Sequence, residues 1–591
     1  MISSVSIFSE SMSEISGTKK VETVHPNAWG YRDTSFAMSD EGMFSLSGDR
    51  YLYSGKKFPS FYEFIQKFGV DKDIRTPPNV EMPPAPAAVF NEVFVSKIRQ
   101  LLPQCKLVSD DANRILASHG HTVQECWELR FGKSWNRLVD AVIFPESHRD
   151  VENIVRLCVE HNVAIIPFGG GTTVSHSLIP TPGERRMILS VSVSSMNKIL
   201  RIDRENLTVS VEAGCVGSHL EKALAAAKFT LGHEPDSWEF STVGGWIATK
   251  ASGMKKNMYG NIEDILIDLK FVTAIGTLSR HTEGIPRCSA GPDVLQMVMG
   301  SEGTLGIVTE AVLKIRPIPE CKQFGSLVFP NFDAGLDFLR KVALLRLQPA
   351  SIRLMDNMQF QLGSSLKPEQ GWHLTVLDRI IKFYVLNIKG FKGEEICAVT
   401  MSFEGSKSQV SEQVKRMNQL GNEFKGMPAG AENGIRGYFL TFVIAYLRDF
   451  GLQYKFLAES FETSAPWSKV RAVIEETKKQ VLADCKAAGV QFEPMISARV
   501  TQTYDSGAAI YFYLGISWKG LSDPVATYSL IEDRARECVM KNGGSISHHH
   551  GVGKIRKAFM NQAVGDVGKS MIRGIKNAVD PNNIFAANNL I

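Results

Sequence analysis

The chain has 591 residues, of which 44% are hydrophobic and 22% charged, and its formal net charge is +4. This length exceeds what one hydrophobic core supports, so we expect two or more domains. The small charge and the lack of an RNA- or DNA-binding signature exclude a nucleic-acid-binding protein. No run of 18 apolar residues predicts a transmembrane helix. The nine cysteines form no C-x-x-C pair, which is typical of reduced thiols in a reducing or neutral compartment.

The first 88 residues are predicted to form a separate N-terminal segment. Its Ser-rich opening, residues 1–20, lacks the apolar core of a secretory signal and is expected to be disordered. Residues 76–88, TPPNVEMPPAPAA, contain five prolines, which excludes a helix or an inner strand. We therefore predict an extended linker or a strap across another domain, and a domain boundary.

A compact α/β pattern begins near Asp140. Residues 141–144 are predicted as a strand, Ser147 as the cap of the next helix, and 163–167 as a second strand. Farther on, residues 207–214 alternate as a strand, and Ser218 with Glu221 predicts a capping box before an Ala-rich helix.

The second strand ends in a glycine loop, PFGGGTT, residues 167–173. Three glycines bend the backbone through φ values that other residues avoid, which leaves amide N–H groups available to an anion. With two threonine hydroxyls beside them, they can receive a pyrophosphate; a plain tight turn is the alternative. Val174 stands where a G-x-G-x-x-G fingerprint needs its third glycine, so an ordinary Rossmann site is excluded.

Two later stretches repeat this glycine and hydroxyl chemistry. They are PDSWEFSTVGGWIATKASG, residues 235–253, and GSEGTLGIVTEAVLKIRPIP, which starts at residue 300 and runs into a strand ending at Pro317. Each alone is compatible with a turn. Three within one α/β region favour a large polar cofactor that lies along several loops.

In order and spacing, these three stretches resemble the FAD-binding domain of the vanillyl-alcohol oxidase type of flavoproteins. Six later stretches resemble, more specifically, the branch of this family that makes the ether bond of ether lipids. They are SIRLMDN (351–357), AYLRDFGLQY (445–454), ESFETSAPW (459–467), RVTQTYDSGAAIYFY (499–513), GGSISHHHGVGK (543–554) and VDPNNIF (579–585). The resemblance runs from about residue 90 to the last residue.

The resemblance implies an α/β plus α+β fold: a two-part FAD-binding domain with a substrate (cap) domain and helical terminal segments. We expect an N-terminal segment at 1–88, a helical region packing on the FAD domain at 89–135, the FAD-binding domain at 136–319, the substrate domain at 320–558 and a C-terminal helical tail at 559–591. It also implies non-covalent FAD, held by Pro167, Phe168, Gly169, Gly170, Gly171, Thr172, Thr173, Pro235, Asp236, Ser237, Trp238, Glu239, Phe240, Ser241, Ala248, Thr249, Lys250, Ala251, Glu302, Gly303, Thr304, Leu305, Gly306, Ile307 and Val308.

The reaction that the resemblance implies is a transfer without net oxidation. The acyl chain of 1-acyl-dihydroxyacetone phosphate is exchanged for a long-chain fatty alcohol, and flavin N5 holds the substrate carbon during the exchange. Two other hypotheses remain open: an FAD-linked 2-hydroxy-acid dehydrogenase, which needs an electron acceptor, and a lipid-binding module with a vestigial flavin site. The module would leave Tyr511 and Arg448 without a purpose.

Such a transfer needs a phosphate anchor, for which Arg448 is the first candidate. It follows YFLTFVIAYL, ten residues without a charge, and a guanidinium there is costly unless an anion meets it. Its neighbour Asp449 is expected to point elsewhere on a helix, so the alternative is a salt bridge to a distant carboxylate. Arg353, in a similar apolar setting, is the second candidate.

The transfer also needs a base, and the resemblance assigns proton abstraction to Tyr511. AAIYFYL predicts a strand with Tyr511 and Tyr513 on one face. A tyrosine in a strand usually belongs to the core, and its ordinary pKa near 10 makes it a poor base unless cations stabilise the phenolate. Arg448 and the three histidines His548, His549 and His550 are the cations that the sequence offers.

The triple histidine also raises the possibility of a metal site. In a strand, His548 and His550 would share one side and His549 would not. No Cys or His cluster at ligand spacing supplies further ligands, so we expect no metal.

Residues 372–391 are apolar around most of a helix, with Lys382 and Lys389 toward its end and Lys392 directly after it. The alternatives are a core helix and a helix that lines a lipid tunnel or lies on a membrane surface. The resemblance further implies a homodimer at the luminal face of the peroxisomal membrane, although the final residues NNLI are not a Ser-Lys-Leu-type address and no presequence motif is visible.

Overall fold

The computed structural model describes residues 24–591 except 26, 79–81, 281–283, 348, 370–379 and 381. The disorder predicted for residues 1–20 therefore lies outside the described residues. The chain divides into two compact units, which are considered separately. Unit 1 comprises the described residues up to Pro77, together with Pro319–Phe461 and Ala465–Gly544, and unit 2 comprises Pro78–Ile318, Glu462–Ser464 and Ser545–Ile591. The histidine segment 548–550, expected in the substrate domain, thus groups with the glycine loops.

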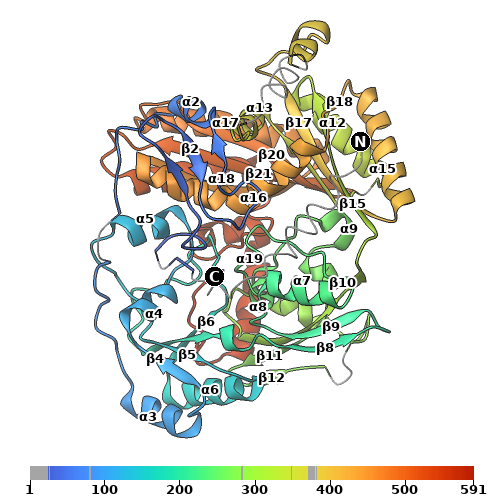
Figure 1. Ribbon diagram of the computed structural model, residues 1–591. Coiled ribbons are helices and arrows are strands. Elements are labelled where there is room, and N and C mark those ends of the chain that lie inside the picture. Colours follow the sequence, from blue (N-terminus) through green and yellow to red (C-terminus); the bar gives the residue numbers. More distant parts are fainter. Residues whose placement is uncertain are drawn as a thin grey trace. The chain divides into compact units, whose positions relative to one another are not determined.

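Unit 2 contains a four-stranded mixed sheet in the order β4-β5-β7-β6. Its strands are β4 (Lys106–Val108), β5 (Ala141–Phe144), β6 (Ala164–Phe168) and β7 (Ile188–Ser192). The two strands predicted here, 141–144 and 163–167, are confirmed as β5 and β6. Ser147 caps α6 (His148–His161) as predicted, accepting the Asp150 N–H at 3.2 Å. Helices α3 (Glu92–Leu101) and α6 lie side by side and share one core with the sheet (Figure 1).

The second sheet of unit 2 is antiparallel, in the order β12-β11-β13-β9-β8. Its strands are β8 (Ile199–Asp203), β9 (Thr208–Glu212), β11 (Leu266–Thr273), β12 (Gly276–Leu278) and β13 (Ile307–Lys314). They confirm the strands predicted after residues 207 and 300. The helices α7 (Gly217–Ala226) and α8 (Val243–Thr249) share a core with this sheet, in which Trp246 is almost fully buried.

The capping box predicted from Ser218 and Glu221 is wrong. Helix α7 begins after Val216, without a side-chain cap. The Glu221 carboxylate instead accepts the Thr230 hydroxyl and, at 3.0 Å, the Leu231 N–H. The carboxylate that was expected to cap the helix therefore accepts hydrogen bonds at the end of β10 (Phe229–Thr230). This strand pairs with β14 (Arg316–Pro317).

The remaining helices of unit 2 are short: α4 (Asp111–Leu116), α5 (Val123–Phe131), α9 (Lys256–Tyr259), α10 (Ile262–Ile265) and α11 (Val294–Val298). The proline-rich segment lies against this unit, because Trp135 Nε1 donates to Pro83 O at 2.9 Å and Arg114 donates to Pro86 O at 2.7 Å. Its described residues form neither helix nor strand, as its prolines predict.

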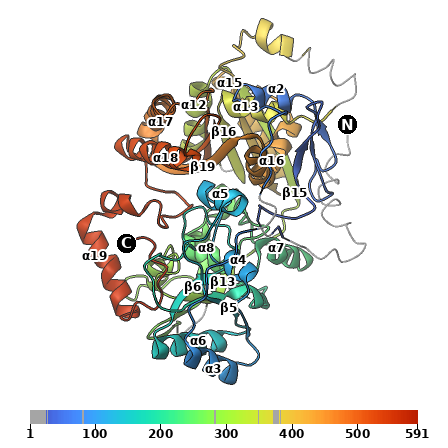
Figure 2. The ribbon, with the colours of Figure 1, turned by 90° about the vertical axis from the view of Figure 1, so that its left-hand side faces the viewer.

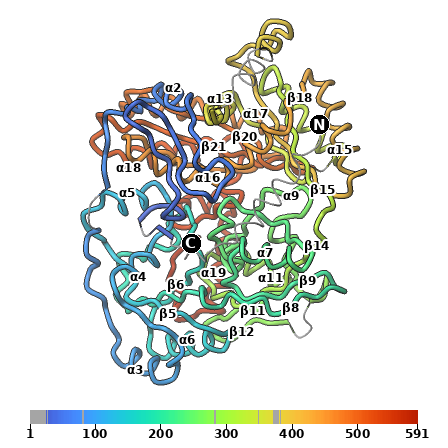
Figure 3. Tube along the Cα trace, in the orientation of Figure 1, coloured from blue at the N-terminus to red at the C-terminus, as the bar shows by residue number. Residues whose placement is uncertain are grey.

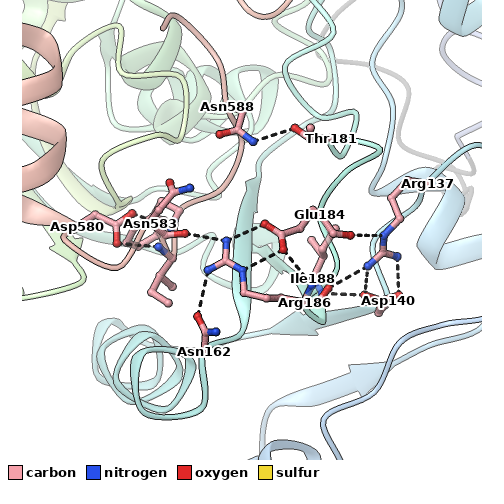
Figure 4. A network of polar contacts seen from close by, with 12 residues as sticks. Arg137, Asp140, Asn162, Thr181, Glu184, Arg186, Ile188, Asp580, Asn583 and Asn588 are labelled. Atoms are coloured by element: carbon pink, nitrogen blue, oxygen red, sulfur yellow. Dashed lines mark hydrogen bonds and ion pairs between the residues drawn. The ribbon is translucent and has the colours of Figure 1, made fainter.

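The C-terminal segment is helical only in its first part, α19 (Met560–Val579). The residues after it run beside β6 (Figure 3), where the Ile165 N–H donates to Ile584 O at 2.7 Å and the Ala586 N–H donates to Ile165 O at 3.2 Å. Figure 4 shows Arg186 between Glu184 and Asn583, donating to the carboxylate of the first and the carbonyl of the second. The last residues thus extend the edge of the four-stranded sheet.

Unit 1 is built on a seven-stranded sheet in the order β18-β15-β17-β16-β20-β21-β19, antiparallel in every pair whose register is known. The strands are β15 (Cys321–Phe329), β16 (Ser351–Met355), β17 (Cys397–Gly405), β18 (Met427–Pro428), β19 (Phe456–Pro466), β20 (Met495–Thr503) and β21 (Gly507–Ser517). Helix α16 (Ala431–Gly451) packs on the face that carries Thr400, close to Gly437. The opposite face is apolar and is covered by α12 (Phe332–Leu344) and α15 (Lys407–Glu423).

Two further helices of unit 1, α17 (Trp467–Ala487) and α18 (Pro524–Lys541), pack on each other and on the sheet (Figure 2). The N-terminal aromatic residues form a small sheet of β1 (Phe36–Met38), β2 (Phe44–Leu46) and β3 (Lys57–Phe58) with α2 (Phe61–Gln66). Together with α13 (Asn357–Ser365), they share a core with α16 in which the Phe44 ring lies 4.8 Å from that of Phe450. This core fixes one side of α16, the helix that carries Arg448.

All nine cysteines lie in the described part of the chain and all are free thiols, as predicted. Among the described helices, none has the length and hydropathy that crossing a bilayer requires.

Candidate functional site

The three glycine-rich stretches meet in unit 2, as the sequence predicts. Gly171 has a φ of +70°, so the first loop uses the left-handed conformation that glycine permits. A Cβ on Gly170 would lie 2.1 Å from Phe240 O, and one on Gly303 would lie 3.1 Å from Pro167 Cδ. The second and third stretches therefore both lie directly against the first.

The first loop offers neutral hydrogen-bond donors. Among the described residues, no acceptor is recorded for the amide N–H groups of Gly170, Gly171 and Thr172. Ser237 of the second stretch donates its hydroxyl to Thr172 Oγ1 at 3.3 Å, which adds hydroxyl groups to the same place. Clustered amide and hydroxyl donors suit an anionic pyrophosphate. The donor set therefore fits the FAD that the resemblance implies.

A fourth segment, which the sequence analysis did not place here, joins this cradle through Glu302. The Glu302 carboxylate is buried and accepts the Val552 and Gly553 N–H groups, each at 2.6 Å. Asn589 is also buried, and its amide donates to Glu302 O at 2.9 Å and to Ser177 O at 3.1 Å. The histidine segment and the C-terminus thus fasten the third stretch to the first, and no local pattern marked Asn589 for this role.

Replacing Glu302 by glutamine should destabilise this cradle. The amide keeps the shape of the carboxylate but turns a donor toward one of the two backbone N–H groups, and leaving a buried donor unsatisfied costs about 1–3 kcal/mol. Thermal unfolding should show that loss in Glu302→Gln, together with weaker retention of FAD on dilution. Glu310→Gln is the matched control, because Glu310, on β13, makes a part-exposed ion pair with Lys270 of β11. Equal stability losses in both variants would show that Glu302 has no special role.

Two buried histidines that the sequence analysis did not single out lie in the same unit. His119 Nε2 and both ring nitrogens of His233 have no hydrogen-bond partner among the residues that the structure describes. Burial lowers the pKa of His233 to about 3. Since buried polar atoms rarely stay unsatisfied, both are candidates for contact with a bound group. His233 directly precedes the second glycine-rich stretch, which was its only sequence signal.

Unit 1 presents a polar face around Tyr511. The rings of Tyr511 and Tyr513 lie 5.6 Å apart on one side of β21, whereas Phe512 stacks on Phe461 on the other, so the predicted alternation is confirmed. Arg499, paired with Tyr511 across β20 and β21, holds its guanidinium carbon 4.5 Å from the Tyr511 ring centroid and 5.0 Å from that of Tyr513. All three residues are buried.

Arg499 is the cation that the sequence analysis missed. The sequence suggests Arg448 and the three histidines as cationic partners of Tyr511, although Arg499 is the first residue of the RVTQTYDSGAAIYFY stretch. Its position over the ring follows from the register of the β20–β21 pair, in which Arg499 faces Tyr511. Ser460 adds a hydroxyl 3.1 Å from the Tyr511 hydroxyl.

Both predicted phosphate-binding arginines belong to unit 1, Arg353 to its sheet and Arg448 to α16. Arg353 is 5% exposed on β16, at the register position opposite Thr400, and donates to the Thr441 hydroxyl of α16 at 2.6 Å. Arg448 lies in the last turn of α16, with its side chain 10% exposed. The expectation that Asp449 points elsewhere is wrong, because Arg448 donates to Asp449 Oδ1 at 3.2 and 3.1 Å. At this helix end, both side chains turn to the same side.

The histidine segment is not a strand, so the expected alternation of faces is wrong. It turns around the buried Glu462, which accepts the Ser547 hydroxyl at 2.6 Å and the backbone N–H groups of His548 and His550. His548 Nδ1 and His549 Nδ1 consequently lie 2.9 Å apart. Glu462 was missed, although it stands in the ESFETSAPW stretch.

Burial and the charge of neighbouring histidines act in opposite directions on the pKa of Glu462 and in the same direction on that of His548. Burial by itself would raise the pKa of Glu462, but the neighbouring imidazoles of His549, His550 and His548 hold that pKa well below its usual range. Burial and the adjacent His549 lower the pKa of His548 to about 3. An ionised carboxylate therefore stands beside a neutral imidazole.

Residues 372–379 and 381 of the segment 372–391 lie outside the described residues. In its described part, the large apolar side chains Ile380, Phe383 and Ile388 are 59%, 60% and 62% exposed. The hypothesis of a core helix is therefore wrong for these residues. Tyr384–Ile388 form one π-helical turn, and Lys382 and Lys389 are exposed beside it.

Comparisons with known proteins agree with this geometry. The "FAD binding domain" family model matches residues 139–282, and the "FAD linked oxidases, C-terminal domain" model matches residues 318–590. An alkyldihydroxyacetonephosphate synthase of Caenorhabditis elegans is 46% identical, over 96% of this chain and 94% of its own. One of Trypanosoma brucei brucei is 32% identical, over 84% and 80%.

A solved structure of an alkyldihydroxyacetonephosphate synthase superimposes with a TM-score of 0.81, covering 96% of this chain and 98% of that one at 27% identity. The match extends over both units, so it includes the glycine-rich cradle and the polar face around Tyr511. On this evidence the chain belongs to the alkyldihydroxyacetonephosphate synthase family.

Proposed function

We propose that the protein is an FAD-dependent transferase of ether lipid synthesis. It exchanges the acyl chain of 1-acyl-dihydroxyacetone phosphate for a long-chain fatty alcohol, giving 1-alkyl-dihydroxyacetone phosphate and a fatty acid. The observation that carries the proposal is the buried pair of Tyr511 and Arg499 in a chain 46% identical to a synthase of this name. A tyrosine that only fills the core gains little from a buried guanidinium. A tyrosine that acts as a base gains from it, because the cation stabilises the phenolate.

The side chains of unit 1 take separate parts in this exchange. Arg448, supported by Arg353, binds the substrate phosphate, because a guanidinium donates two parallel hydrogen bonds to phosphate oxygens. Tyr511 removes the proton from the carbon next to the ketone. Arg499 stabilises the phenolate that makes this possible, since a nearby cation favours the charged form of an acid. When bound by the amides and hydroxyls of the cradle, FAD would supply the electrophile that the exchange requires.

The function is tested with radiolabelled fatty alcohol and unlabelled acyl-dihydroxyacetone phosphate. Label should appear in the alkyl product, with one fatty acid released per ether formed and no electron acceptor added. The competing dehydrogenase is tested by adding a 2-hydroxy acid under anaerobic conditions. If that acid bleaches the flavin band and no ether is formed, the protein is a dehydrogenase and the proposal of a transferase is wrong.

FAD should be bound without a covalent link. The donors of the cradle are backbone amides and hydroxyls, which hold the cofactor by hydrogen bonds. Acid precipitation of the yellow protein should therefore release the flavin into the supernatant, where its absorbance can be measured. Colour that stays in the pellet after washing would contradict this prediction.

We also propose that the protein associates peripherally with a membrane, on the luminal face in peroxisomes, as a homodimer. Both substrates carry chains that come from a bilayer. Exposed apolar side chains next to lysines, as at Phe383 and Lys382, suit the interface between headgroups and acyl chains. Flotation with phospholipid vesicles tests the membrane association, and a fluorescent fusion in cells tests the peroxisomal location. Light scattering tests the homodimer.

A further inference from the structure

Three side chains of unit 2 form a set of metal ligands that the proposed reaction does not call for. Glu462, His548 and His549 each offer one ligand atom, and these atoms all lie within 4.8 Å of one another. We propose that this cluster binds a divalent transition-metal ion such as Zn²⁺, and that the bound ion inhibits the enzyme. The inhibitory part rests on the proposed function, and the binding part does not.

The ligand types select the class of ion. Two imidazole nitrogens and one carboxylate oxygen are the donors that Zn²⁺ takes in sites with three protein ligands. Mg²⁺ and Ca²⁺ prefer oxygen ligands alone, so neither suits this set. The proposal therefore concerns Zn²⁺ and similar ions of the first transition series.

The spacing of the two nitrogens is compatible with one ion. In a tetrahedral site with Zn–N bonds of about 2.0–2.1 Å, two nitrogen ligands are about 3.3 Å apart. The Nδ1 atoms of His548 and His549 are 2.9 Å apart, so a small rotation of either ring reaches that separation. Because the rings belong to adjacent residues in a turn, both can move without a change in the strands around them.

The carboxylate is already held in position. Glu462 is 1% exposed and accepts the Ser547 hydroxyl at 2.6 Å and the His550 N–H at 2.9 Å. Outer hydrogen bonds of this kind orient metal ligands and strengthen binding. His550 donates its backbone N–H to the carboxylate and holds its Nδ1 atom 3.7 Å from Glu462 Oε1, but its ring is not part of the ligand group.

Three protein ligands leave one coordination position of a tetrahedral ion open. A water molecule can take that position. The ion would also occupy the nitrogen lone pairs of His548 and His549, two of the three histidines that the sequence offers as cations for the Tyr511 phenolate. Bound Zn²⁺ should therefore stop the exchange until a chelator removes it.

The binding test uses the full-length protein with its flavin, first dialysed against a chelator. Zn²⁺ is titrated in competition with a chromophoric chelator, and Co²⁺ difference spectra report the ligands independently of activity. We expect one ion per chain. His549→Ala should weaken Zn²⁺ binding at least tenfold, because a ligand is lost, and His550→Ala should leave it within about threefold. Glu462→Gln should also weaken Zn²⁺ binding at least tenfold. This variant is informative if it retains FAD and the wild-type melting temperature.

The inhibition test follows ether formation by the untreated enzyme as Zn²⁺ is added. Activity should fall over the concentration range in which Zn²⁺ binds and return on addition of a chelator, while Mg²⁺ has no effect. No stoichiometric binding, or equal binding by wild type and His549→Ala, overturns the site. Stoichiometric binding without loss of activity overturns the inhibition. An enzyme that forms no ether even without metal refutes the proposed function and leaves the binding result valid.

Discussion

Replacing Tyr511 by phenylalanine should reduce ether formation by a factor of 10² to 10⁴, because a general base contributes that much and phenylalanine has no proton acceptor. The substitution removes one oxygen and almost no volume, so the packing of β21 should survive. The Arg499 guanidinium would still lie over an aromatic ring. We therefore expect an unchanged melting temperature and flavin spectrum.

The measurement that isolates this step is hydrogen exchange. Wild type and Tyr511→Phe are incubated with acyl-dihydroxyacetone phosphate in tritiated water, and the exchange of the carbon-bound hydrogen should vanish in the variant together with ether formation. Tyr513→Phe is the matched control, a buried tyrosine on the same face, 5.6 Å away, and it should keep both activities. If Tyr511→Phe exchanges the carbon-bound hydrogen at the wild-type rate, Tyr511 is a structural core residue and one of His548 to His550 is the better candidate for the base.

Replacing Arg448 by alanine should cost about 2–5 kcal/mol in transition-state stabilisation, with FAD still bound. The reason is the loss of a charge-assisted pair with the substrate phosphate in a shielded place. Arg448→Lys keeps the charge and loses the fork, so it should restore only part of the activity. Steady-state kinetics with acyl-dihydroxyacetone phosphate give kcat/KM for each variant.

One further variant separates phosphate binding by Arg448 from a purely structural role of this arginine in α16. Asp449 accepts the Trp29 N–H at 2.6 Å as well as the Arg448 guanidinium, so a purely structural Arg448 would act through Asp449. Arg436→Met removes another buried arginine of α16, and it should lower stability and leave kcat/KM largely unchanged. Normal activity in Arg448→Ala, or an equal loss in Arg436→Met, would end the phosphate hypothesis.

The elements that depend on local pattern could be predicted from the sequence. Residues 141–144 and 163–167 are β5 and β6 because each is a short apolar run bounded by turn residues, and Ser147 caps α6 because its hydroxyl reaches the Asp150 N–H. Tyr511 and Tyr513 share a face because side chains in a strand alternate with a period of two. The glycine loop exposes its amides because three glycines permit that turn.

Predictions about polar partners failed where a side chain had more than one group within reach. Glu221 accepts hydrogen bonds from Thr230 and Leu231 at the end of β10 instead of capping its own helix. Asp449 meets the guanidinium of its direct neighbour, which helical periodicity alone does not suggest. The histidines bend around Glu462, which a strand of alternating side chains would not allow.

The sequence by itself determined the order of strands and helices around the glycine loops, the face on which Tyr511 lies and the apolar helix that carries Arg448. Only the tertiary structure decided which charges meet these groups. Arg499 reaches Tyr511 through the register of two strands, and Asn589 reaches the Glu302 carbonyl across 287 residues of chain. Glu462 is 88 residues from His550. Local periodicity fixes the direction of a side chain relative to its own element, whereas its partner depends on how distant elements pack, and that is set by the burial of the whole core.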